Sequence, residues 1–318
     1  MPTIDSHPPR SIVLSQNRYN ADLIMEKTKT LNSKTVYLDS ANWYDLAEGS
    51  ADKERFEQAV KKGVVLPVVS FIHVLEFGNR EEPYRSHATA YVNSINSLTP
   101  ILWTRGLPAI IEAEVRNVFL SSIGLPTVPV NPFMKHLVDA LEVKLPWFDR
   151  AEARACSFSE IVRLSASTTS RTTYHDFRRS SPVFDIARLR ALRTMTPDGY
   201  LVKDIQQYAA SILGNRAETA SGIVIDVTPE LREHFEGNFS LVPCPAFSHK
   251  LAFFDGWSLS SGGEEPSMFE DLFHLVALGY CDEVFADKGT WEALKKGRAT
   301  RLPLANREFK HWLDRLPV

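Results

Sequence analysis

The sequence predicts an α/β protein in which a parallel sheet is flanked by helices. Short β-branched and apolar segments, each about one strand long, alternate with segments of helical periodicity. Acidic residues follow several of these apolar segments or lie in the helices after them. Strand-helix alternation favours a parallel sheet, and ligands of such sheets bind beyond the carboxyl ends of the strands.

The first predicted strand covers residues 34–38, a β-branched and apolar run that stops at Asp39. Helical spacing begins a few residues later, so Asp39 should end a buried strand and precede a helix. Asn42 lies three residues beyond Asp39 and is a candidate for placing water in a site. Capping of the helix explains Asn42 about as well, and it also explains Asp39 as a helix cap.

The second predicted strand covers residues 64–69, and Ser70 then offers an N-cap for a helix. Glu76 falls about two turns into that helix, as a carboxylate among apolar neighbours, unless it faces solvent. Arg80 lies four residues beyond Glu76. We expect Arg80 to pair with Glu76, and contact with a substrate phosphate is the alternative.

A third helix should open with the capping box of Ser267 and Glu270, which places Asp271 in its first turn. An acid there also suits the helix dipole without any metal. His274 lies one turn further on and could reach a phosphate or hold a water molecule. An ordinary hydrogen-bonded helix histidine is the expected role for it, and for His73 as well.

Residues 282–287 form the last predicted strand, which ends at Asp287. Gly289 follows, and Thr290 is expected to cap the next helix. Turn chemistry next to a glycine is the purely structural explanation for Asp287.

Three stretches, residues 36–43, 66–76 and 270–287, resemble the acidic motifs of PIN-domain nucleases. The resemblance implies a parallel sheet flanked by helices and an endonuclease that depends on Mg²⁺ or Mn²⁺ and acts most often on RNA. The residues that would match the four metal-binding and catalytic acids are Asp39, Glu76, Asp271 and Asp287.

The chain departs from the family pattern in two places. The family usually has Thr or Ser before the last acid, whereas this chain has Ala286. The long stretch between Glu76 and Asp271 implies a large insertion. We therefore predict a PIN-like core at 34–124 and 266–318, interrupted by a mainly helical insertion at 125–265.

The chemistry of the four acids agrees with the resemblance. Hard divalent cations prefer oxygen ligands, and Mg²⁺ commonly takes one or two carboxylates together with water and substrate phosphate. Acids that lie close together repel one another unless a cation or a raised pKa relieves them. A metal held in this way can activate water for in-line attack on a phosphodiester.

Charge is distributed unevenly along the chain, although the formal net charge is only -3. Residues 150–193 hold nine arginines against four acidic residues. This segment is predicted to grip a nucleic-acid backbone, with a solvated helix face as the alternative. The candidate nucleic-acid contacts are Arg171, Tyr174, Arg178 and Arg179.

The spacing of the cysteines and the hydropathy of the chain predict its cellular compartment. Cys156, Cys244 and Cys281 are widely scattered, which indicates neither a disulfide framework nor a zinc site and favours a reducing cytoplasm. We predict neither a signal peptide nor a membrane-spanning segment. The oligomeric state is not predicted.

Several functions stay open from the residues alone. RNA is the expected substrate and single-stranded DNA the alternative. A PIN-like module that binds nucleic acid without catalysis is also open, whereas a haloacid-dehalogenase-like phosphatase would need a second acid at the position of Ala41. A toxin or defence effector is one biological role that fits, and such proteins are often held by an inhibitory protein partner.

Overall fold

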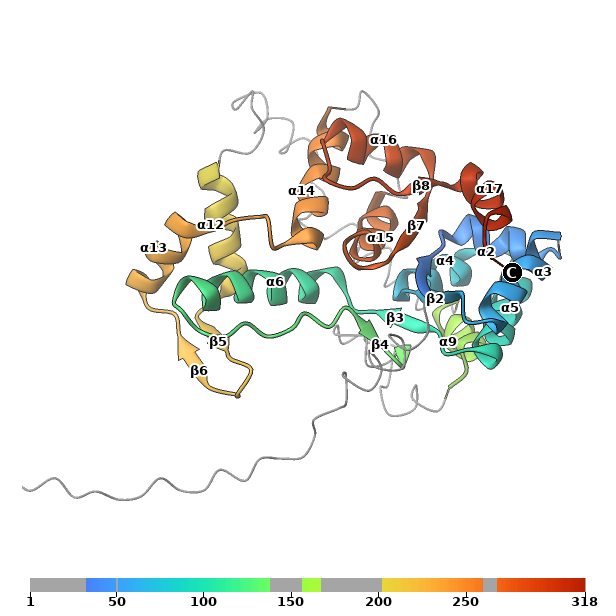
Figure 1. Ribbon diagram of the computed structural model, residues 1–318, viewed down its shortest axis with the longest axis horizontal. Coiled ribbons are helices and arrows are strands. Elements are labelled where there is room, and N and C mark those ends of the chain that lie inside the picture. Colours follow the sequence, from blue (N-terminus) through green and yellow to red (C-terminus); the bar gives the residue numbers. More distant parts are fainter. Residues whose placement is uncertain (1–32, 50, 138–155, 167–201, 260–267, 318) are drawn as a thin grey trace, which may run out of the picture.

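A computed structural model describes residues 33–49, 51–137, 156–166, 202–259 and 268–317 (Figure 1). The described residues form an α/β fold in which a mostly parallel sheet of six strands is flanked by helices, as predicted. Among these residues, the structure has no helix that is both long and apolar enough to cross a membrane.

The main sheet has the strand order β4-β3-β2-β1-β7-β8. Only β4 runs antiparallel to its neighbour. The strands are β1 (Lys34–Tyr37), β2 (Val65–Val69), β3 (Leu102–Thr104), β4 (Phe133–Met134), β7 (Glu283–Ala286) and β8 (Leu304–Ala305). A separate antiparallel hairpin consists of β5 (Arg216–Glu218) and β6 (Val224–Asp226).

The strand order reverses at β1. From β1 the chain adds β2 and β3 on one side, and much later it returns to add β7 and β8 on the other side. The parallel register of Val36 with Glu283 and of Tyr37 with Val284 aligns β1 and β7. The crevice beyond the carboxyl ends of such a pair is where doubly wound sheets bind ligands. We call it the β1/β7 edge.

The two faces of the sheet carry two separate cores. Side chains alternate along a strand, so Val65 and Val69 of β2 belong to one core and Leu66 and Val68 to the other. Apolar residues at nearly every strand position are what a sheet covered on both faces requires.

The helices divide between these two cores. Those that pack with Val65 and Val69 are α2 (Ser40–Ala47), α3 (Ala51–Lys61), α5 (Tyr84–Leu98), α9 (Phe158–Ser165) and α17 (Phe309–Asp314). Those on the opposite face are α6 (Leu107–Ser122), α12 (Val202–Leu213), α13 (Pro229–Asn238), α14 (Pro245–Ser258), α15 (Met268–Tyr280) and α16 (Lys288–Lys296). Helix α4 (Phe71–Asn79) packs Val74 and Phe77 into the first core.

Helices of the predicted insertion pack directly on those of the predicted core. Helix α9 contacts α4 and α5, and α14 contacts α15 and α16. The described part of 125–265 is largely helical, apart from β4 and the β5–β6 hairpin. The boundaries of the insertion stay a prediction.

Helices α14 and α16 pack backbone against backbone. A Cβ atom added to Gly256 would lie 1.7 Å from the carbonyl oxygen of Ala293, and one added to Gly297 would lie 1.7 Å from that of Ala252. Only glycine permits this approach. Because α16 begins immediately after Asp287, the packing of α14 also fixes one residue of the β1/β7 edge.

We expect Gly256→Ala to destabilise the protein strongly, since the clash is with backbone that no side-chain rotation relieves. Overpacking of this kind costs about 1–3 kcal/mol, and more where backbone must move. Gly237→Ala in α13 is the matched control, because a Cβ there meets nothing within 4 Å. That variant should be neutral or more stable by up to ~1 kcal/mol. Urea denaturation measures both, and equal stabilities would refute the packing argument.

Candidate metal centre

Asp39 comes two residues after β1, at the N-cap position of α2, as the sequence predicts. Its side chain makes no capping hydrogen bond. Instead, its Oδ2 accepts a hydrogen bond of 2.6 Å from Nδ2 of Asn306, which follows β8. Capping therefore does not account for this carboxylate, which lies at the β1/β7 edge.

Glu76 projects from α4, which begins after Ser70 as predicted. The hydroxyl of Ser40 donates to Oε2 of Glu76. Oε1 of Glu76 lies 3.2 Å from Nε2 of His274, and the side chain of Glu76 is only 21% exposed. Glu76 therefore faces the interior of the site rather than solvent.

His274 of α15 completes a three-residue group with Asp39 and Glu76. Each of the three offers one ligand atom, and these atoms lie within 4.8 Å of one another. His274 is hydrogen-bonded within the protein, as expected, and the structure also places it beside two of the predicted acids.

Asp271 and Asp287 add charge to the same site. Burial, and then the charge of Asp287, raises the pKa of Asp271 to about 8, and Asp39 and Glu76 contribute to the same increase. The charge of Asp287 also contributes to the raised pKa of Asp39. The four acids predicted from separate parts of the sequence are therefore close enough to influence one another.

Asp287 has a structural role as well. Its Oδ1 accepts a hydrogen bond of 2.6 Å from the backbone N–H of Thr290, and so Asp287 is the N-cap of α16. The expected cap at Thr290 was wrong, because the helix already begins at Lys288 and Thr290 is buried within its first turn. One carboxylate oxygen of Asp287 is engaged in this way.

The charges of the site are balanced in part by His274. Burial alone would lower the pKa of His274, but the charge and hydrogen bond of Glu76, with Asp39 and Asp271, raise it to about 9. Burial opposes ionisation of Glu76, yet the charge and hydrogen bond of His274 hold its pKa below the usual value. Burial raises the pKa of Asp39 despite the opposing charge of His274. Without a metal, His274 is thus an imidazolium among carboxylates.

His73 is a satisfied interior histidine, as predicted. Its Nε2 donates to the carbonyl oxygen of Leu38 at 2.8 Å, and its Nδ1 accepts from the backbone N–H of Ser70 at 3.0 Å. Burial, followed by the charge of His274, lowers the pKa of His73 to about 4. This neutral ring lies beside the site, with its centroid 5.3 Å from that of His274.

The remaining candidates have mixed outcomes. Asn42 is buried, and its Oδ1 has no hydrogen-bond partner among the described residues. The guanidinium of Arg80 lies over the ring of Tyr44, 5.2 Å from its centroid. The expected pair of Arg80 with Glu76 is not among the ion pairs that join described residues. Four candidate contacts lie outside the described residues: Arg171, Tyr174, Arg178 and Arg179. Ser267 of the expected capping box also lies outside them.

Sequence reasoning missed Asn306 and Ser40, which hydrogen-bond the carboxylates of Asp39 and Glu76. Asn306 follows β8 much as Asp287 follows β7. Strand β8 has only two residues, Leu304 and Ala305, too few for a recognisable periodicity. Ser40 had a visible signal, because it directly follows the first acid.

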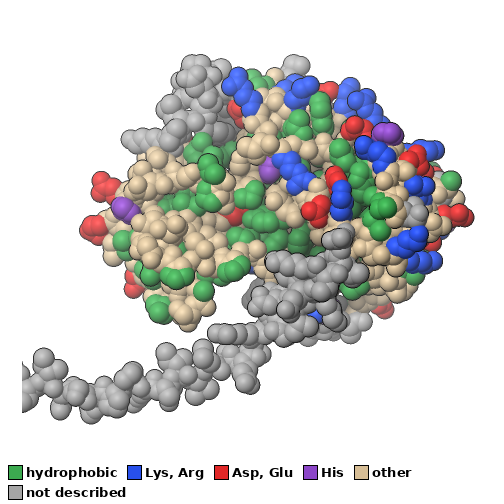
Figure 2. Space-filling view, viewed as in Figure 1, with side chains coloured by type: hydrophobic (Ala, Val, Ile, Leu, Met, Phe, Trp, Pro, Cys, Tyr) green, Lys and Arg blue, Asp and Glu red, His purple; other side chains and the backbone are tan. Residues whose placement is uncertain are grey.

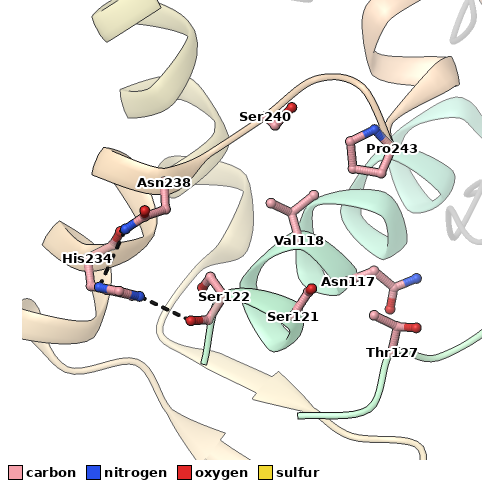
Figure 3. Close-up of a pocket in the computed structure, with 9 residues that line it drawn as sticks. All are labelled: Asn117, Val118, Ser121, Ser122, Thr127, His234, Asn238, Ser240 and Pro243. Atoms are coloured by element: carbon pink, nitrogen blue, oxygen red, sulfur yellow. Dashed lines mark hydrogen bonds between the residues drawn. The ribbon is translucent and has the colours of Figure 1, made fainter. Parts of the chain in front are cut away.

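A pocket of about 510 Å³ lies elsewhere, between α6 and α13 (Figure 3). Its lining residues are Asn117, Val118, Ser121, Ser122, Thr127, His234, Asn238, Ser240 and Pro243. Nε2 of His234 lies 3.1 Å from the carbonyl oxygen of Ser122. The lining includes neither an acid nor a predicted site residue, so this pocket is separate from the candidate metal centre.

No family model, curated protein or solved structure matches the chain.

Asp271→Asn should stabilise the metal-free protein near pH 8. An unfolded aspartate titrates near ~3.9, whereas burial and Asp287 raise the pKa of Asp271 to about 8. The folded state holds this proton more tightly than the unfolded state does. The free energy of unfolding of the wild type therefore falls as the pH rises between these two pKa values. Asparagine removes the loss, and we expect a gain on the order of 1–2 kcal/mol after allowance for screening.

Calorimetric melting in EDTA between pH 5 and 8 measures this gain as a rise in Tm. The control is Asp314→Asn, which changes an exposed aspartate of α17. A gain that stays constant with pH, or that is equal in both variants, would contradict the crowding of charge around Asp271.

Proposed function

We propose that this protein is a metal-dependent nuclease with a PIN-like fold, an endoribonuclease that hydrolyses phosphodiester bonds. The observation that carries the proposal is the convergence of acids at the β1/β7 edge. Asp39 and Asp287 follow the adjacent strands β1 and β7, and Glu76, Asp271 and His274 approach from neighbouring helices. This is where doubly wound sheets bind their ligands.

The residues fit a divalent cation by their chemistry. Asp39 and Glu76 supply carboxylate oxygens, the donors that Mg²⁺ and Mn²⁺ prefer. Burial raises the pKa of both Asp39 and Asp271, and the charges of neighbouring carboxylates add to the increase. A divalent cation bound there would relieve the repulsion and supply a Lewis acid for attack on a phosphodiester.

The protein's own residues hold the ligand atoms in place. Nδ2 of Asn306 orients Asp39, and the hydroxyl of Ser40 orients Glu76. Asp287 is fixed by its capping bond to Thr290. Sites held by strand ends and helix caps keep their geometry better than sites on long loops. The acids are therefore positioned before a substrate arrives.

A polyanionic substrate is supported by the basic surface next to the site. Residues 288–315 hold eight Lys and Arg against three acidic residues. Figure 2 shows Lys and Arg side chains gathered over the part of the molecule that contains α16 and α17. Lys288 and Arg307 are both exposed, and each directly follows a site residue, Asp287 and Asn306 respectively. Basic side chains of this kind neutralise backbone phosphates.

RNA remains the first substrate choice because of the resemblance of the acidic motifs, with single-stranded DNA as the alternative. A cytoplasmic location and control by an inhibitory protein partner belong to the same proposal. A binding module without catalysis is less well supported, because all four acids are present and electrostatically coupled.

Cleavage of end-labelled single-stranded RNA and DNA in Mn²⁺ or Mg²⁺ tests the activity. We expect Asp39→Asn to lower the cleavage rate on the order of 10²-fold or more, because a neutral amide replaces an anionic ligand. Asp45→Asn makes the same chemical change on the exposed side of α2 and should leave the rate unchanged. Wild-type cleavage by Asp39→Asn, or cleavage that persists in EDTA, would rule out this site.

The basic surface makes a separate prediction. Replacing both Lys288 and Arg307 by Ala should weaken binding of single-stranded RNA with little dependence on its sequence. Each lost phosphate contact lowers the slope of log affinity against log salt by about 0.7, so the pair should lower it by up to ~1.4.

Fluorescence anisotropy between low and moderate salt measures this slope. Lys61→Ala with Lys62→Ala is the matched control. These exposed lysines precede β2 and so lie near the amino ends of the strands, away from the carboxyl ends where the acids gather. Arg178→Ala with Arg179→Ala tests the predicted arginine-rich arm in the same assay. An unchanged slope for the Lys288 and Arg307 pair, with a reduced slope for the arginine pair, would place the binding surface on the arm.

A further inference from the structure

We propose that His274 is a direct metal ligand through Nε2, and that the site consequently prefers a transition-metal ion such as Mn²⁺ to Mg²⁺. This inference rests on the proposed function for the location of the site. It concerns which ion the protein selects, and its test measures metal binding rather than cleavage.

The first support is the position of the imidazole. Nε2 of His274 lies 3.2 Å from Oε1 of Glu76 and belongs with Asp39 and Glu76 to one group of potential ligand atoms. His274 is almost completely buried, so its ring cannot turn away into solvent. Two carboxylates and an imidazole nitrogen therefore face the same small volume.

The second support is a chain of hydrogen bonds behind the ring. Nδ1 of His274 is hydrogen-bonded to the hydroxyl of Tyr37, which lies 2.7 Å from Oγ of Ser70. Oγ of Ser70 in turn lies 3.1 Å from Nδ1 of His73. The hydroxyls of Tyr37 and Ser70 can each donate and accept, so all the hydrogen bonds of the chain can point the same way.

His73 ends this chain as an acceptor. Its Nε2 faces the carbonyl oxygen of Leu38, which can only accept, so Nε2 carries the hydrogen. Nδ1 of the neutral ring then accepts a shared bond, from the backbone N–H of Ser70 at 3.0 Å and from its Oγ at 3.1 Å. Donors can then run from His274 Nδ1–H to Tyr37, from Tyr37 to Ser70, and from Ser70 to His73. In that arrangement a cation that displaces the Nε2 proton of His274 would meet the nitrogen lone pair beside the acids.

Metal-binding histidines normally donate their other ring N–H to a protein group, which fixes the tautomer and the orientation of the ring. Tyr37 is in position to accept that bond, and it is completely buried. The chain thus gives His274 the support expected of a metal ligand.

Ion preference follows from the donor atoms. Mg²⁺ demands oxygen ligands and retains several waters, whereas imidazole nitrogen suits transition-metal ions. A site with Asp39, Glu76 and His274 should therefore bind Mn²⁺ more tightly than Mg²⁺, by a wider margin than a site of carboxylates alone.

The test uses the chain of residues 1–318 with MnCl₂ and MgCl₂, without nucleic acid. Calorimetric titration gives the two affinities, and pulsed electron paramagnetic resonance of bound Mn²⁺ detects a directly bonded ¹⁴N nucleus. We expect the wild type to show the nitrogen coupling. His274→Asn should lose it, and the ratio of Mn²⁺ to Mg²⁺ affinity should fall about tenfold or more.

Tyr37→Phe provides a second variant that keeps the shape of the buried ring. It should retain the nitrogen coupling while Mn²⁺ affinity falls about tenfold, because only the support of Nδ1 is lost. His234→Asn, in the separate pocket of Figure 3, is the control for an unrelated histidine and should leave both measurements unchanged. If His274→Asn does not fold, Tyr37→Phe and the wild-type coupling decide the question.

The outcomes separate this inference from the nuclease proposal. Mn²⁺ binding without nitrogen coupling in the wild type overturns the role of His274, even if the protein cleaves RNA. Nitrogen coupling that His274→Asn abolishes supports the inference, even if no nucleic acid is cleaved. Absence of any Mn²⁺ binding overturns both.

Discussion

The pairing of β1 with β7 is the constraint on which the site depends. The two strands lie far apart in the sequence, and their parallel register is fixed by Val36 with Glu283 and Tyr37 with Val284. Side chains reinforce it at the amino end, where Asp282 accepts bonds of 2.8 and 2.7 Å from the backbone and hydroxyl of Thr35. A shift of register would separate Asp39 from Asp287 and turn the alternating core residues to the wrong faces of the sheet.

Burial of so much negative charge sets the second constraint. Carboxylates removed from water must be paired, protonated or bound to a cation. The metal-free protein uses all the internal means available: a proton on His274, a raised pKa at Asp271, and hydrogen bonds to Asp39 and Glu76. A cation bound there, as proposed, would replace the proton between His274 and Glu76.

Much of the architecture could be predicted from the sequence, because it depends on local patterns. Continuous apolar runs located β1, β2 and β7, and the residues after them located Asp39 and Asp287. The roles of His274 and Asn306 could not be predicted in this way. His274 depends on the approach of α15 to α4, and Asn306 on a two-residue strand at the edge of the sheet. Such contacts come from tertiary packing, which no local periodicity records.

Structural and functional explanations of the same acid need not exclude each other. Asp287 caps α16 with one oxygen, and through α16 it is tied to the close backbone packing against α14. Its charge nevertheless reaches Asp271 and Asp39. A carboxylate fixed by a helix cap has lost its rotamer freedom already, so ordering it around a cation costs little further entropy. The helix cap that gives Asp287 a structural role would thus also make it an effective part of a metal site.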